Sequence, residues 1–308
     1  MKRIPGIILG TILILWPLTG AAALPDKRYE LATDAVRVLY DAGRQTNAER
    51  IADISPALFR ELEAATGLTI DFRPTVIPAS NRHDFRRMGG HDAVVAFALP
   101  ERGQVVLDLS RFDVRPALFR PVLKHEYVHL LLHRHIASQH LPRWLDEGIA
   151  QQLSDGLSEY LPGRSQMVLG EAFAADRVFP LSALERRFPG DAFGHQLAYE
   201  QSRSIVGYMA QRYGDEFLKA LVVRMADGAS VAKAFRSVSG IMLSDFEADW
   251  RQRQTAPLSW MGLIAGHVYG LLFFLAALVT LIGYVRHRRR RRAYDAAEDD
   301  DDLEDGWR

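Results

Sequence analysis

The residue types and spacing most able to do chemistry lie at His125, Glu126 and His129. If residues 125–129 form a helix, the two imidazole rings lie one turn apart on one face and can share a metal ion. Glu126 then lies close enough to a water at the metal to accept its proton. The spacing therefore predicts metal-assisted hydrolysis with a carboxylate as the general base.

The surrounding residues favour a buried helix for this motif. Leucine and valine residues are dense from 123 to 132, and Pro116 and Pro121 suit a first helical turn just upstream. Unpaired histidines and a glutamate would be costly in such a buried segment. The alternative is an ordinary helix in which the three polar residues coincide by chance.

Two residues are candidates for a third metal ligand. His135 follows His129 by six positions, but that arrangement needs a glycine where the helix stops, and this chain has Leu132 there. Glu147 follows His129 by 18 positions, after a polar break and Pro142, which can open a second helix. We therefore expect Glu147, from a neighbouring helix, to complete the site and leave a fourth position open.

Residues 142–150, which read PRWLDEGIA, resemble the P-x-W-L-x-E-G-x-A segment of gluzincin peptidases, especially the bacterial peptidase-MA-like family. The resemblance implies a zinc-dependent peptidase that hydrolyses peptide bonds in peptide or protein substrates. It implies His125, His129 and Glu147 as Zn²⁺ ligands. It also implies Glu126 as the general base and acid.

A further part of the resemblance lies downstream, where residues 198–209 are similar to the Y-x-Q-S helix of this family. In related gluzincins a tyrosine after the third ligand donates a hydrogen bond to the developing oxyanion, which makes Tyr199 the candidate here. The alternative is a tyrosine that packs in an amphipathic helix. The resemblance covers residues 115–252 well and residues 30–115 only in general pattern.

The sequence contains no G-x-M-E-N-like segment of the kind with which aminopeptidases hold a free amino terminus. We therefore expect an endopeptidase. The rival from another class is a non-catalytic, metal-stabilised, membrane-anchored binding module, and the intact Glu126 argues against it. An intramembrane protease is disfavoured because Arg120, Lys124 and Arg134 crowd the motif.

Two apolar segments predict the topology. Residues 1–23 have the basic start, short apolar centre and small-residue end of a signal peptide, with a retained anchor as the alternative. Residues 258–285 carry no formal charge and are long enough to span a bilayer as one helix. Arginines follow directly in the tail, residues 286–308, and keep it cytoplasmic. We expect a single-pass protein of the bacterial inner membrane with its catalytic domain, residues 24–255, in the periplasm or cell exterior.

Composition argues against a disulfide-stabilised fold and against a nucleic-acid-binding protein. The chain has no cysteine, so disulfides do not hold the exported part together. Its formal net charge is zero, which gives no global basic field for nucleic acid. The arginine run reads as a stop-transfer signal, and the acidic end of the tail, rich in aspartate from 295 to 305, reads as a solvated segment whose partner is unknown.

The pattern of the exported part predicts an α+β fold, a small mixed sheet followed by helices, as in gluzincin domains. Residues 35–41 and 68–78 read as extended, 47–66 as an amphipathic helix ended by Gly67, and 81–92 as a loop. Segments 93–99 and 104–109 flank PERG and predict a hairpin. We expect the strand near 104–109 to line the cleft and pair with an extended substrate.

Overall fold

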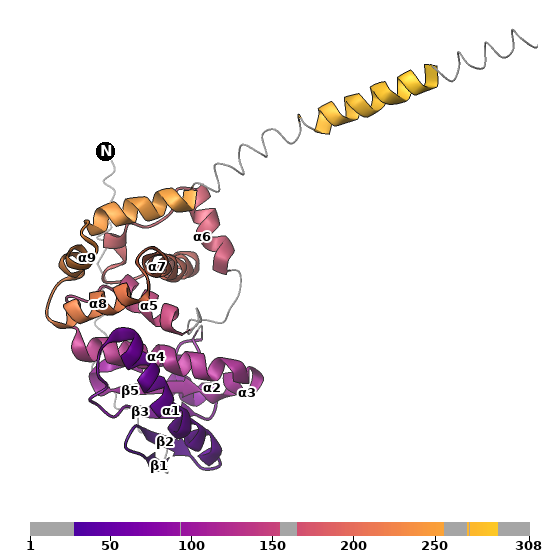
Figure 1. The fold of residues 1–308 in the computed structure, drawn as a ribbon. Helices are drawn as coiled ribbons and strands as arrows, with labels where there is room; N and C mark the ends of the chain where they lie inside the picture. The colour runs from indigo at the N-terminus through magenta and orange to yellow at the C-terminus, as the bar shows by residue number, and fades with distance from the viewer. Residues whose placement is uncertain (1–27, 93, 155–164, 256–269, 271, 289–308) are drawn as a thin grey trace, which may run out of the picture.

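A computed structural model describes residues 28–92, 94–154, 165–255, 270 and 272–288. A five-stranded sheet with three helices forms the first part of the fold, and a larger helical part follows it (Figure 1). The α+β arrangement predicted from the sequence is therefore confirmed.

The sheet contains both parallel and antiparallel strands in the order β1-β2-β3-β5-β4. Its members are β1 (Arg28–Ala32), β2 (Arg37–Asp41), β3 (Thr75–Ala79), β4 (Ala96–Leu99) and β5 (Gln104–Asp108). The β1–β2 and β4–β5 pairs are antiparallel, whereas β2–β3 and β3–β5 are parallel. The predicted hairpin is the β4–β5 pair, in which the short 3₁₀ turn η1 (Pro100–Arg102) ends at Gly103, whose φ of 59° suits glycine.

Three helices accompany the strands. They are α1 (Gln45–Thr66), α2 (Arg82–Arg87) and α3 (Leu109–Val114). The buried positions of α1 recur every three or four residues, which gives it one apolar face, and Gly67 ends it in the left-handed conformation with φ 70°. The predicted loop over 81–92 is wrong in part, because α2 forms there, with Asn81 as its N-cap and Phe85 as its buried anchor.

Apolar side chains cover both faces of the sheet. On one face, Val38, Val76 and Val105 join the main core together with buried residues of α1 and the later helices. On the other face, a small cluster gathers around Phe85 and Val106. The sheet is therefore held between α1 and α4 on one side and α2 on the other.

The helical part begins after a 3₁₀ turn, η2 (Pro116–Leu118). Its helices are α4 (Phe119–His135), α5 (Arg143–Leu153), α6 (Ser165–Ala174), α7 (Ala192–Tyr213), α8 (Asp215–Ala226) and α9 (Val231–Ser239), with η3 (Leu181–Leu184) before α7 and further helical residues at 243–255 and 272–288. Helix α5 lies between α4 and α7, and α4 also lies against β4. Through these contacts α4 connects the sheet to the helical part.

The close approach of α5 to α7 depends on Gly148. A Cβ atom built there would lie 2.6 Å from the Ser202 carbonyl oxygen and 2.4 Å from Cγ2 of Val206, both on α7. Glycine is therefore the residue that lets the helix carrying Glu147 pack at this distance.

Within the described ranges, no helix combines the length and apolar composition that a membrane crossing requires. The predicted span 258–285 falls partly outside these ranges, because residues 258–269 and 271 are not described. The predicted signal peptide at 1–23 and the tail from 289 onward also lie outside the described residues.

Candidate metal centre

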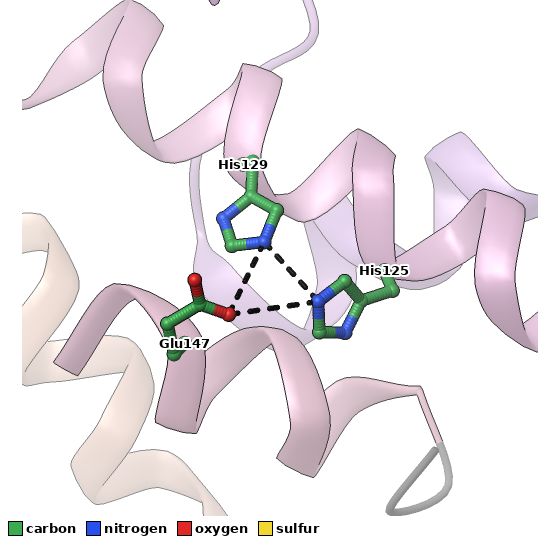
Figure 2. A group of neighbouring side chains, drawn as sticks. All are labelled: His125, His129 and Glu147. Carbon is green, nitrogen blue, oxygen red and sulfur yellow. Dashed lines mark hydrogen bonds and ion pairs between the residues drawn. The ribbon is translucent and has the colours of Figure 1, made fainter. Parts of the chain in front are cut away.

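Helix α4 presents both histidines of the motif to the interior. The Nε2 atoms of His125 and His129 lie 3.2 Å apart, and the rings meet edge to face (Figure 2). His125 is fully buried and His129 is 8 % exposed. The helical spacing predicted for the motif therefore places two imidazole nitrogens together at one point.

Helix α5 brings Glu147 to the same point. Pro142 precedes the helix with φ −69° and ψ 144°, and the helix starts at Arg143, so Glu147 lies in its second turn. The Oε2 atom of Glu147 lies 3.8 Å from Nε2 of His125 and 3.7 Å from Nε2 of His129 (Figure 2). The three side chains predicted as ligands thus form one buried group.

The group has the dimensions of a metal site. A tetrahedral zinc ion with nitrogen and oxygen ligands at about 2.0–2.1 Å holds those ligands about 3.3 Å from one another, close to the 3.2, 3.7 and 3.8 Å found here. Oε2 of Glu147 is buried and forms no hydrogen bond with any described residue, which is costly for a carboxylate oxygen. A divalent cation among these atoms would satisfy it, so the residues fit zinc.

Asp146, the residue before Glu147, fixes the orientation of His129. Nδ1–H of His129 donates to Oδ1 of Asp146 at 2.9 Å, and Nε2–H of His133 donates to Oδ2 at 3.1 Å. Burial favours the neutral His129 ring, but the Asp146 carboxylate outweighs burial and raises the pKa of His129 well above its ordinary value. A carboxylate on the outer nitrogen is the usual support of a metal-binding histidine, because it leaves Nε2 directed at the metal.

The other oxygen of Glu147, Oε1, accepts a hydrogen bond from the Tyr199 hydroxyl at 3.0 Å. Nη2 of Arg143 lies 3.7 Å from the same oxygen. Burial raises the pKa of Glu147, and the Asp146 charge adds to this effect, while His129, Arg143 and Tyr199 oppose it. Oε1 is therefore held by the protein, whereas Oε2 faces the histidines.

Glu126 is fully buried and lies beside this group in a cleft of about 520 Å³. The cleft is lined by Phe97, Ala98, Pro100, Glu126, His129, His133, Ser138, Leu141, Arg143, Asp146, Glu147, Glu185 and Arg186. The carboxylate predicted as general base thus shares one solvent-accessible space with two of the predicted ligands.

Strand β4 contributes Phe97 and Ala98 to the lining of the cleft, and no residue of β5 is among its lining residues. We expected the strand near 104–109 to line the cleft and pair with substrate, and this is wrong. Strand β5 lies between β3 and β4, so both of its edges are already paired. The N–H of Asp108 donates to the carbonyl oxygen of Val95, and in an antiparallel pair every second residue bonds to the partner strand. The N–H and C=O groups of residues 97 and 99 therefore point toward β5, whereas those of Ala98 point away from it.

The remaining histidines of this region lie outside the group. Nε2 of His135, the alternative third ligand, lies 2.8 Å from the Thr69 carbonyl oxygen. His133 is turned toward Asp146, and His140 is not part of the group.

Two residues that contact the ligands were not predicted from the sequence. Asp146 and Arg143 both lie within the segment 142–150. The contact of Asp146 with His129 arises only when α5 packs against α4, whereas Arg143 and Glu147 are four residues apart on α5 itself. The signal that could have found Asp146 is an acidic residue next to a ligand, since metal-binding histidines need an acceptor on their outer nitrogen.

Two of three comparisons with known proteins give a match. Residues 117–256, just under half of the chain, match the family model of the Peptidase MA superfamily. Among solved structures, the chain is similar to an M1 zinc metallopeptidase variant from Deinococcus radiodurans bound to a Tyr-Ser-Ala substrate. The identity is 15 % and the TM-score 0.40, and the match covers 74 % of this chain and 50 % of that one. This chain therefore spans about half the length of that structure. Comparison with curated protein sequences gives no significant match.

Proposed function

We propose that this chain, whose residues 117–256 match the family model of the Peptidase MA superfamily, is a membrane-anchored zinc-dependent endopeptidase. The observation that carries the proposal is the convergence of two histidines from α4 and one glutamate from α5 on a single buried point. Glu126 adjoins that point in an open cleft, which is what hydrolysis requires.

The proposed roles follow from the positions of the side chains. His125, His129 and Glu147 would hold Zn²⁺ through the atoms that converge, two Nε2 atoms and Oε2. When bound, zinc would supply Lewis acidity that polarises the scissile carbonyl group and lowers the pKa of water. Glu126 accepts the proton of the attacking water on its carboxylate and passes it to the leaving amine.

Tyr199 has two proposed roles that an experiment can separate. From its position on α7, its hydroxyl holds Oε1 of Glu147, which supports a role in positioning the third ligand. The oxyanion role that the family resemblance implies stays a prediction, because it requires the hydroxyl to donate to the substrate during turnover.

Endopeptidase activity is the finer part of the proposal. It is supported by the missing G-x-M-E-N-like segment, which is the kind of segment with which aminopeptidases hold a free amino terminus. The edge position of β4 also supports it, because an extended peptide could pair with the outward backbone groups of Ala98 on either side of the scissile bond.

Membrane anchoring and a periplasmic catalytic domain are proposed from the two apolar segments. Residues 272–288 form a helix whose side chains are exposed, among them Phe273 at 79 % and Val279 at 69 %. Exposed apolar residues on every face of a helix suit lipid rather than water. Alkaline extraction tests the anchor, and external protease on spheroplasts tests the orientation. Release of the protein by alkaline extraction would show that the proposed anchor is wrong. A catalytic domain that external protease spares would show that the proposed orientation is wrong.

The test of the catalytic proposal compares the full-length protein with Glu126→Gln, both purified in detergent. We expect equal zinc content, and loss of nearly all cleavage of a proteome-derived peptide library in the variant only. Near-native cleavage by Glu126→Gln would exclude the proposed base. A zinc-loaded wild type that binds peptides without cleaving any would support the alternative of a non-catalytic binding module.

A further inference from the structure

Tyr199, whose hydroxyl holds the third ligand, packs against two other aromatic rings. The ring of His195 is stacked on it, with centroids 5.1 Å apart and planes 29° from parallel. Phe188 meets it nearly at a right angle, with centroids also 5.1 Å apart. Both separations fall in the range of favourable aromatic pairs. Because Tyr199 is only 4 % exposed, its ring is held by these neighbours and not by water.

Helix α7 sets the position of His195. It lies four residues before Tyr199, about one helical turn, so both side chains share one face of the helix. Asp191 is the N-cap of this helix, and its carboxylate accepts a hydrogen bond from the N–H of Gly194 at 2.8 Å. The rings of His195 and Phe188 also meet each other, 6.1 Å between centroids. The three rings therefore form one cluster at the start of α7.

The ring of His195 is uncharged at neutral pH. Burial lowers its pKa, and the charges of Arg143 and His91 lower it further against the opposing effect of Asp191. An uncharged imidazole contacts Tyr199 as a flat aromatic ring. The stack therefore depends on the shape of the ring, which phenylalanine can reproduce.

One hydrogen bond connects this cluster to the metal group. The Tyr199 hydroxyl donates to Oε1 of Glu147 at 3.0 Å, and Oε2 of the same carboxylate faces the two histidines. A carboxylate that is held at one oxygen presents the other in a fixed direction. Among the described residues that line the cleft, His195 is not included, so its route to the site is through Tyr199 and not through substrate.

We propose that His195 is a positioning residue, whose ring keeps the Tyr199 hydroxyl on Glu147 and so keeps the third ligand directed at zinc. The inference rests on the proposed function, because it concerns the same zinc site. A swing of Tyr199 away from Glu147 would break the hydrogen bond, and the stacked ring opposes that swing. Contacts that orient a ligand in this way act on metal affinity.

The first experiment measures the zinc affinity of the full-length protein by competition with a chromophoric chelator. His195→Ala should weaken zinc binding about 3–10-fold, which is the size of effect that one aromatic pair allows. His195→Phe keeps a flat ring and should bind zinc within about twofold of wild type. Phe193→Ala is the matched control, because Phe193 lies two residues earlier on α7 and is 40 % exposed, and it should keep the wild-type affinity.

A double-mutant cycle separates positioning from general support of the fold. In a Tyr199→Phe background no hydroxyl remains to be held, so His195→Ala should have no further effect on zinc affinity. A residue that only stabilises the fold would lower zinc affinity by the same factor in both backgrounds. Urea unfolding of each metal-free variant confirms that it is folded under the assay conditions. If His195→Ala does not fold, His195→Leu, which fills the space without a flat ring, replaces it in both measurements.

Three results would overturn the inference. They are wild-type zinc affinity in His195→Ala, equal losses in the two backgrounds, and a His195→Phe variant that binds zinc as weakly as His195→Ala. Each of these leaves the zinc site and the proposed peptidase intact. If the wild-type protein itself binds no zinc, the proposed function fails and the positioning role fails with it.

Discussion

Nδ1 of His129 lies 2.9 Å from Oδ1 of Asp146, and this contact turns the other ring nitrogen toward His125 and Glu147. One helix, α5, therefore supplies both the third ligand of the site and the acceptor that orients a ligand from α4. The pairing makes the geometry of the site depend on how these two helices pack.

Replacing Asp146 with asparagine should weaken zinc binding about 10–100-fold, because the outer acceptor of His129 loses its charge. The affinity is measured by competition with a chromophoric chelator. His133→Gln is the control, since it removes the other partner of Asp146 and leaves the His129 contact in place. Unchanged zinc affinity in Asp146→Asn would show that this contact does not support the metal.

The pH dependence should differ between the metal-free and the zinc-loaded protein. Burial opposes the charged form of His129, but Asp146 outweighs burial and raises the pKa of His129, while the pKa of Asp146 is lowered by the histidines despite its burial. In the metal-free protein the pair is therefore most stabilising between pH about 4 and 6.5. That contribution is lost as pH rises through the raised histidine pKa, and lost again in acid.

Zinc binding has the opposite trend, because the metal requires the neutral ring. Zinc affinity should therefore increase with pH, and the midpoint of this increase should lie above about 6.5, the pKa of an ordinary histidine. The measurement pairs zinc titrations with urea unfolding of the metal-free protein from pH 5.5 to 9. A midpoint for zinc binding below pH 6 would contradict the raised pKa.

Tyr199→Phe separates the two roles proposed for the hydroxyl. Loss of the hydrogen bond to Glu147 should lower zinc affinity about tenfold, at the weak end of the effects seen for such supporting contacts. The variant is then assayed at saturating zinc. If turnover returns to the wild-type value, the hydroxyl only positions Glu147. A remaining loss of kcat of about 100-fold, with KM unchanged, would establish the oxyanion role.

Gly148→Ala should push α5 and α7 apart. The added methyl group would meet the Ser202 carbonyl and Val206, and backbone cannot move aside cheaply. We expect a loss of about 1–3 kcal/mol in the free energy of unfolding together with weaker zinc binding. Gly170→Ala in α6 is the matched control, because its Cβ would meet nothing within 4 Å, and it should be neutral or stabilise by up to about 1 kcal/mol.

Ala98→Pro tests the role of β4. Its N–H points away from β5, so proline removes a donor that the sheet does not use. The variant should fold, yet KM for a peptide should rise about 2–10-fold, as the loss of one hydrogen bond predicts. Ala98→Val keeps the N–H and controls for added bulk. Equal KM in wild type and the proline variant would exclude pairing at this position.

The local parts of the fold were predictable from the sequence. The apolar period of α1, its end at Gly67 and the PERG turn of the β4–β5 hairpin each depend on residues close together in the chain. Helix α2 was missed because only Phe85 in its six residues is buried, which leaves no periodic pattern to detect. Strand order was missed because β3 pairs with β5 across a long sequence separation, and this pairing decides which strand is the edge.

The candidate site follows the same division. His125 and His129 could be predicted as a ligand pair because residues four apart in a helix lie on one face. Glu147 was predicted from the resemblance of its segment to gluzincin peptidases. The contact of Tyr199 with Glu147 could not be predicted, because α7 and α5 meet only in the folded molecule. The same holds for Arg143 and Phe188, which lie far apart in the chain. Asp146 had a signal, its place beside a ligand, but its pairing with His129 depends on how α4 and α5 pack.

The metal group lies among residues of the main core, with Leu123, Val128, Leu145 and Ile149 on either side of its members. Occupancy of such a group is coupled to folding, and zinc at about 100 times its dissociation constant adds about 2.7 kcal/mol to the folded state. Zinc starvation of a cell should then shorten the lifetime of the protein against proteases. The half-life of the protein is measured by pulse-chase labelling with and without a chelator. Equal half-lives would show that the core stays folded without the ion.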